Sequence, residues 1–99
     1  SVIFTSSGVG RAGRAFWGAY SVSKFATEGF MQILADELEN TSNVRVNCIN
    51  PGATNTAMRR AAYPAEPPDT NPAAEDIMGA YLYLMGPDSA DHGVSFNAQ

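Results

Sequence analysis

The sequence has one cysteine, few basic residues and no long apolar run, and each shortage excludes a class of protein. The single Cys48 cannot form a disulfide within the chain. Six basic residues stand against ten acidic ones, for a net charge of -4, and the only basic doublet is Arg59-Arg60. A nucleic-acid-binding surface is therefore not expected. No apolar stretch reaches membrane-spanning length and no signal-peptide pattern is present, so we expect no membrane partner and a cytoplasmic location.

The composition that is present is that of a globular protein. Hydrophobic residues make up 44% of the 99 positions and charged residues 16%, which suits at most one modest domain. No group of His, Cys, Asp and Glu has the spacing of metal ligands, so we expect no metal site. The sequence opens on Ser1-Val-Ile-Phe and closes at Gln99, both within strand-like runs. We expect residues 1–99 to form a single partial domain of a longer protein.

The hydrophobic pattern predicts an alternation of strands and helices. Two apolar, β-branched runs and a final short one read as strands, and two longer segments have helical spacing of apolar residues. The segment 53–72 holds four of the six prolines and predicts a mobile functional loop, with a short helix over 56–62 as an option. In the second helix, Ile77, Met78, Tyr81, Leu82 and Met85 should form one apolar face. The expected strands are 2–6, 44–50 and one from 94, and the expected helices are 16–40 and 72–85.

This order predicts an α/β fold with a parallel sheet and right-handed crossovers. Ligands of such sheets bind at the carboxyl ends of the strands. Ser7 ends the first predicted strand, Pro51-Gly52 ends the second, and Tyr20 and Lys24 lie near the start of the helix between them. We therefore expect these residues to meet at one edge of the sheet.

Tyr20 and Lys24 lie one helical turn apart, a spacing at which an ammonium can prepare a phenol to donate its proton to a carbonyl. Alone, a Tyr-x-x-x-Lys pair occurs by chance in roughly one in five to ten chains of this length. The alternative is a surface lysine beside a half-buried tyrosine. Ser7, thirteen residues before Tyr20, and the Pro51-Gly52 turn favour the catalytic interpretation.

Residues 8–13, Gly-Val-Gly-Arg-Ala-Gly, match the G-x-G-x-x-G pattern of a pyrophosphate-binding loop. Two requirements of that motif are missing. The glycines do not open the predicted helix directly, because residues 14–17 come before its body, and the next strand ends in Asn-Pro where an acidic residue is expected. We expect these glycines to let the backbone turn close to the site.

Ser7, the Tyr20-x-x-x-Lys24 motif and Asn50-Pro51-Gly52 followed by Thr56 resemble the catalytic half of the short-chain dehydrogenase/reductase family. The resemblance covers the whole chain and implies the second half of a Rossmann-like, doubly wound parallel sheet. Within the family, the sequence around the motif looks like that of a bacterial group of oxidoreductases with poorly assigned substrates.

The resemblance implies an NAD(P)-dependent carbonyl reductase or alcohol dehydrogenase. Tyr20 would be the proton donor or acceptor, Lys24 would tune Tyr20 and bind the nicotinamide ribose, and Ser7 would orient the substrate oxygen. Hydride transfer belongs to the cofactor, NAD or NADP. The positions implied to contact the cofactor are Tyr20, Lys24, Pro51, Gly52, Ala53, Thr54 and Thr56.

The resemblance has gaps and alternatives. The family's glycine-rich pyrophosphate loop, its selector for NAD against NADP and its upstream catalytic asparagine have no counterpart here, so the isolated chain should be inactive. The Pro51-Gly52 turn is also explained as an ordinary end to a strand. A nucleotide-sugar epimerase and a non-catalytic cofactor-binding protein remain alternatives. We expect a small-molecule carbonyl or alcohol substrate, and the family's subunit contacts through the long helix imply a homodimer or homotetramer.

Overall fold

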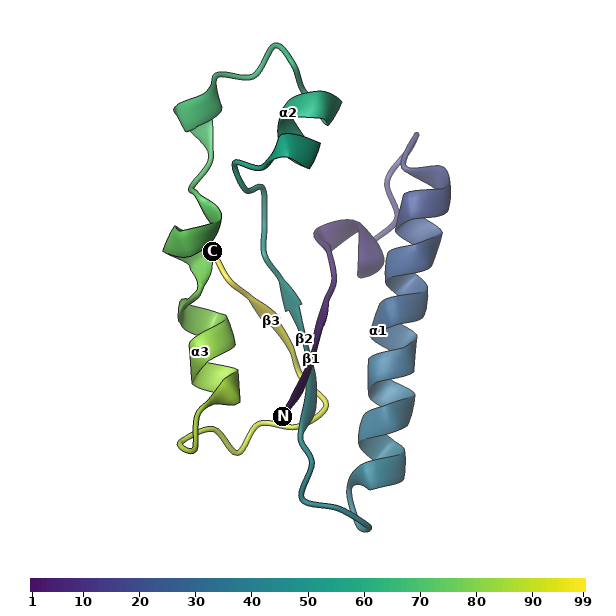
Figure 1. The fold of residues 1–99 in the computed structure, drawn as a ribbon. Coiled ribbons are helices and arrows are strands. Elements are labelled where there is room, and N and C mark those ends of the chain that lie inside the picture. Colours follow the sequence, from purple (N-terminus) through teal and green to yellow (C-terminus); the bar gives the residue numbers. More distant parts are fainter.

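Three parallel strands form the middle layer of the chain, which a computed structural model describes over residues 1–99 (Figure 1). The strands are β1 (Val2–Thr5), β2 (Val46–Asn50) and β3 (Ser95–Asn97), in the order β1-β2-β3. Val2 pairs with Val46, and Cys48 pairs with Ser95. Helical segments join each strand to the next, so the predicted β-α-β-α-β order is confirmed.

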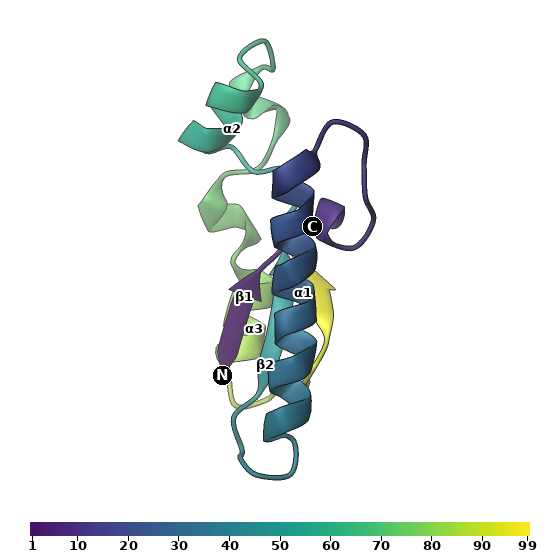
Figure 2. The ribbon, with the colours of Figure 1, turned by 90° about the vertical axis from the view of Figure 1, so that its right-hand side faces the viewer.

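Helices cover both faces of this sheet. Figure 2 shows α1 (Gly18–Leu38) in front of the strands and α3 (Gly79–Met85) behind them. The central strand β2 is consequently sealed, and Val46 through Ile49 have no exposed surface. A strand covered on both faces needs no alternation of apolar and polar residues, which explains the sequence Val-Asn-Cys-Ile. The buried Asn47 is satisfied by Asp91 O at 3.0 Å and Val94 N at 3.1 Å.

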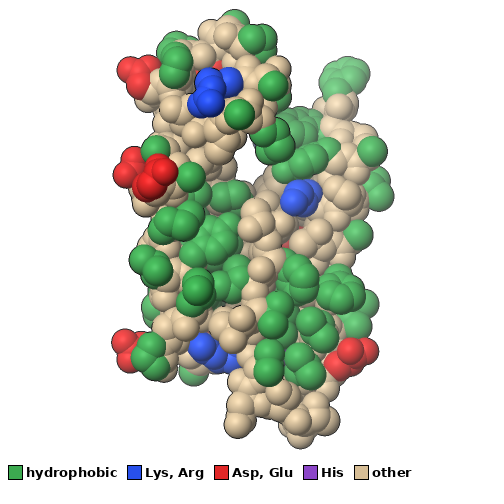
Figure 3. Space-filling view, in the orientation of Figure 1, with side chains coloured by type: hydrophobic (Ala, Val, Ile, Leu, Met, Phe, Trp, Pro, Cys, Tyr) green, Lys and Arg blue, Asp and Glu red, His purple; other side chains and the backbone are tan.

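The core lies between α1 and β2. Met31 and Ala35 of α1 pack against Val46 and Cys48, with half-buried apolar residues of β1 and the end of α1 around them. The opposite side of α1 is also apolar but exposed, and Figure 3 shows hydrophobic side chains at the surface over both outer helices. The exposed apolar residues of α1 include Val22, Phe25, Phe30 and Ile33.

No helix combines the length and the hydropathy that crossing a membrane requires.

Two predicted helix boundaries differ from the structure. The long helix begins at Gly18, because Phe16 has a φ of 71°, a left-handed conformation that a helix does not continue. The predicted helix 72–85 is wrong as one element: a 3-10 turn, η3 (Ala74–Ile77), precedes α3. The break between η3 and α3 changes which side chains face the sheet. Leu84 is buried, whereas Leu82 is 67% and Met85 65% exposed, so the predicted apolar face is also wrong.

The proline-rich segment 53–72 contains the short helix α2 (Ala57–Ala62), as the sequence allowed, and the 3-10 turn η2 (Pro68–Thr70). Asn55 N donates to Pro72 O at 2.8 Å and closes the base of the segment. Arg59 pairs with Glu66 at 2.9 Å and lies 3.9 Å from the centroid of the Tyr63 ring. Arg59 is therefore part of the loop's own structure.

Candidate active site

Ser7 follows β1 and begins a short turn, η1 (Gly8–Gly10). Gly10 N donates to Ser7 O at 2.9 Å, and Val9 N donates weakly to the Ser7 hydroxyl at 3.4 Å. A hydroxyl that only accepts still has its own proton to donate. The half-buried Ser7 can therefore donate a hydrogen bond to an oxygen outside the chain.

Tyr20 and Lys24 lie on the first two turns of α1. The ammonium of Lys24 donates to Thr5 O at 3.1 Å, and its nitrogen lies 5.6 Å from the centroid of the Tyr20 ring. Tyr20 is 39% exposed, and its ring stacks obliquely on Trp17 with centroids 5.7 Å apart. An ammonium has three protons, so two remain for acceptors outside the chain. Positive charge is thus fixed beside an accessible phenol.

Gly10 holds the Ser7 turn against α1. A Cβ atom at position 10 would lie 2.8 Å from Lys24 Cβ and 2.9 Å from the Lys24 carbonyl group, so only glycine permits this approach. The Ser21 hydroxyl donates to Val9 O at 2.5 Å and fastens the same turn. The structure thereby brings Ser7, Tyr20 and Lys24 to the carboxyl end of β1, the edge that the topology predicted.

The segment after β2 turns sharply at the same edge. Gly52 has a φ of 74°, and its N–H donates to Asn50 Oδ1 at 3.0 Å. The Gln99 amide donates to Pro51 O and Ala53 O, both at 2.8 Å. A Cβ atom at Gly52 would come within 2.7 Å of this amide nitrogen, so position 52 requires glycine for its conformation and for its space.

The residues after Gly52 differ in which hydrogen-bond donors they leave without a partner in the chain. The N–H groups of Ala53 and Thr54 donate to no group of the chain, while the Thr54 hydroxyl donates to Gly52 O at 3.1 Å. The Thr56 hydroxyl accepts from Arg59 N at 3.1 Å and caps α2. The free donors of this segment thus include the N–H groups of Ala53 and Thr54 and the hydroxyl proton of Thr56.

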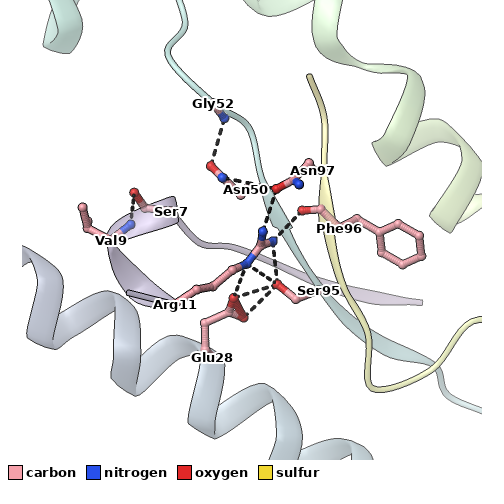
Figure 4. A network of polar contacts seen from close by, with 9 residues as sticks. All are labelled: Ser7, Val9, Arg11, Glu28, Asn50, Gly52, Ser95, Phe96 and Asn97. Atoms are coloured by element: carbon pink, nitrogen blue, oxygen red, sulfur yellow. Dashed lines mark hydrogen bonds and ion pairs between the residues drawn. The ribbon is translucent and has the colours of Figure 1, made fainter. Parts of the chain in front are cut away.

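A polar network beside this edge was not predicted from the sequence. Glu28 is only 6% exposed and receives hydrogen bonds from Arg11 at 3.0 Å and Ser95 at 2.7 Å (Figure 4). Burial alone would raise the pKa of Glu28, but bonds from Ser95, Cys48 and Arg11, with the Arg11 charge, outweigh it and hold the pKa below its ordinary value. Burial and the contact with Glu28 raise the pKa of the Cys48 thiol to about 12.

One signal in the sequence does point to this network. Glu28 has the helical spacing of the buried residues Ser21, Met31 and Ala35, at positions three or seven away. A carboxylate on the buried side of a helix needs a partner, because isolated buried charges are unstable. The identity of the partner, Arg11, depends on the tertiary fold and is not visible in the spacing.

Comparisons with known proteins decide the family. The family model described as short chain dehydrogenase matches residues 1–67. The chain belongs to the short-chain dehydrogenase family. The observed sheet, with α1 and α3 on its two faces, matches the solved structures of that family, of which the chain covers a part.

Three relatives of this short-chain dehydrogenase chain share its sequence over nearly all of its length. A short chain dehydrogenase from Pseudomonas syringae is 68% identical, with a TM-score of 0.93 over 98% of this chain and 40% of that one. The uncharacterized oxidoreductase YciK of Escherichia coli K12 is 59% identical over all of this chain and 39% of its own length. A Shigella flexneri 2a short chain dehydrogenase, solved in complex with NADP, is 59% identical with a TM-score of 0.92, over 98% of this chain and 40% of that one. The chain thus spans about two fifths of these relatives.

Proposed function

We propose that this chain supplies the proton-transfer groups of an NAD(P)-dependent oxidoreductase that interconverts a small-molecule carbonyl and its alcohol. The observation that carries the proposal is the placement of Lys24, which Thr5 O holds at 3.1 Å while its nitrogen lies 5.6 Å from the Tyr20 ring. In a short-chain dehydrogenase, this pair places a positive charge beside a phenol that the solvent and a substrate can reach.

In this proposal the chain's own residues divide the work on the substrate oxygen. Ser7 donates a hydrogen bond to that oxygen and orients the substrate. Tyr20 gives its proton to the same oxygen during reduction and takes it back during oxidation. Lys24 stabilises the negative charge that remains on the Tyr20 oxygen.

The donors present fit a nicotinamide dinucleotide, which supplies or accepts the hydride when bound. Lys24 has two protons left for ribose hydroxyls, and Tyr20 lies beside it. The Pro51-Gly52 turn presents the N–H groups of Ala53 and Thr54 without partners in the chain, which suits the oxygen of a carboxamide. NADP is the first cofactor to test, because the Shigella flexneri relative was solved with it, and NAD remains open.

The proposal includes a longer polypeptide, since the chain spans about two fifths of its relatives. The adenine half of the cofactor site would come from residues outside these 99, and the isolated chain would be inactive. A cytoplasmic location and a homodimer or homotetramer belong to the same proposal. Turnover by the isolated 99 residues, or a monomer at all concentrations of the full-length protein in sedimentation, would contradict these parts.

The test is a Tyr20→Phe substitution in the full-length protein, assayed by NADPH or NADH consumption with a panel of small aldehydes and ketones. Loss of a general acid should lower kcat by about 100-fold to 10,000-fold. Cofactor affinity, measured by fluorescence titration, should stay nearly unchanged because the Tyr20 ring and Lys24 remain.

Tyr83→Phe is the matched control, because its hydroxyl donates to Asp91 on the far side of the sheet at 2.9 Å, and it should retain activity. Full activity of Tyr20→Phe would refute the proposed role. Turnover of a nucleotide sugar without net consumption of cofactor would instead show an epimerase. Cofactor binding without turnover of any substrate would favour a non-catalytic protein.

A further inference from the structure

Arg11 connects the Ser7 turn to the last strand of the sheet. Its guanidinium donates to Glu28 Oε1 at 3.0 Å, to the Ser95 hydroxyl at 2.7 and 3.0 Å and to Phe96 O at 2.8 Å. Charge-assisted bonds of this kind are stronger and more directional than neutral ones. These three partners, one of which is a buried carboxylate, help to fix the arginine in place (Figure 4).

The same guanidinium begins a chain of hydrogen bonds that ends at the Gly52 turn. Arg11 Nη1 donates to Asn97 Oδ1 at 2.6 Å, and Asn50 Nδ2 donates to the same oxygen at 3.3 Å. The other end of the Asn50 amide, Oδ1, accepts from Gly52 N at 3.0 Å. Figure 4 shows these groups in sequence from Arg11 to Gly52.

The two ends of this chain fix the polarity of the amides between them, because the Arg11 guanidinium and the Gly52 N–H can only donate. Asn97 therefore turns its oxygen toward Arg11, and Asn50 turns its oxygen toward Gly52. The NH2 group of Asn50 then faces the Asn97 oxygen. With Arg11 absent, Asn97 is free to reverse, which would place its NH2 group against the NH2 group of Asn50 and remove the acceptor that holds Asn50 in place.

We propose that Arg11 is a positioning residue of the cofactor site, which acts through Asn97 and Asn50 to hold the Gly52 turn. The inference rests on the proposed function, because it assigns this turn to the nicotinamide side of the cofactor. Arg11 itself touches neither substrate nor cofactor. Its effect is to fix the direction in which the peptide groups after Gly52 point.

The experiment compares Arg11→Met with Arg14→Met in the full-length protein. Arg14 lies in the same loop, is exposed and makes no side-chain hydrogen bond, so it is a matched control. We expect Arg11→Met to raise the KM for NADPH by about tenfold, the effect of losing one charge-assisted hydrogen bond. A merely structural role would lower the amount of active protein, and hence the apparent kcat, without changing this KM.

A second pair of variants avoids disturbing Glu28. Asn97→Leu leaves Arg11 on Glu28 and Ser95 but removes the acceptor for Asn50, and it should raise the KM for NADPH to a similar extent. Asn97→Asp restores an acceptor and should rescue most of the loss. Equal KM values in Asn97→Leu and the wild type, or no rescue by Asn97→Asp, would overturn the inference.

Nuclear magnetic resonance separates this inference from the proposed function. The backbone amide of Gly52 and the side-chain amide of Asn50 should shift in Arg11→Met and Asn97→Leu and stay in place in Arg14→Met. If the wild type binds neither NADPH nor NADH, the proposed function fails while these shifts still show whether Arg11 controls the turn. If the wild type binds cofactor but these amides do not shift in Arg11→Met and Asn97→Leu, this inference alone is overturned.

Discussion

Replacing Gly10 with alanine should separate turn η1 from helix α1. The added Cβ would lie 2.8 Å from Lys24 Cβ, about 0.7 Å closer than the nearest favourable carbon contact, and 2.9 Å from the Lys24 carbonyl carbon and oxygen. Two of these three atoms are backbone, so no side-chain rotation relieves the contact. Overpacking of this kind lowers the free energy of unfolding by about 1–3 kcal/mol.

The displacement also reaches the proposed catalytic groups, because Lys24 is the residue that is pushed. A shift of about 1 Å in a positioned group can lower the rate by about 100-fold. Urea unfolding and NADPH-dependent turnover of the full-length protein measure the two effects. Gly13→Ala is the control, since a Cβ there meets nothing within 4 Å. If Gly10→Ala matches Gly13→Ala in both stability and turnover, the close packing of Gly10 on Lys24 is refuted.

Three further predictions concern the titrating groups. The Cys48 thiol, buried and with a pKa of about 12, should resist alkylation at neutral pH until the protein is unfolded, and rapid labelling of the native protein would contradict its placement. The depressed pKa of Glu28 stabilises the fold above the unfolded-state value near 4.5, and this contribution is lost as the pH falls through the lower folded-state pKa. Urea midpoints measured from pH 7 to pH 3 should therefore fall less steeply in Glu28→Gln than in the exposed control Glu75→Gln. Arg59→Met should speed limited proteolysis within 57–72 more than Arg60→Met, because Arg59 alone pairs with Glu66.

Local patterns in the sequence predicted the parts of the fold that local forces determine. The runs at 2–6 and 44–50 became β1 and β2, and Thr56 caps the short helix that the sequence allowed. The prediction of the second helix as one element was wrong because of how this segment packs in the tertiary structure. Its apolar residues continue through η3 and α3, but the break between these two elements rotates the later ones, so Leu84 is buried and Leu82 is not.

The candidate site divides in the same way. The common placement of Ser7, Tyr20 and Lys24 was predictable, because they lie near strand and helix ends whose common edge the topology dictates. The Arg11–Glu28 pair could not be predicted in this way, since its geometry depends on the pairing of β3 with β2. A helical acid on the buried side of α1 signalled that some cation must approach, but five arginines and one lysine were available.

The polar network also carries a consequence for how this protein can evolve. Its hydrogen bonds join residues 17, 67, 84 and 86 positions apart in the sequence. Each side chain in the network provides a hydrogen-bond partner for another, so a single substitution leaves a buried carboxylate or an amide without its partner. Across homologous sequences, Arg11, Glu28, Ser95 and Asn97 should therefore be kept together or exchanged together. The last strand should then be inherited jointly with the loop after the first one, although most of the chain lies between them.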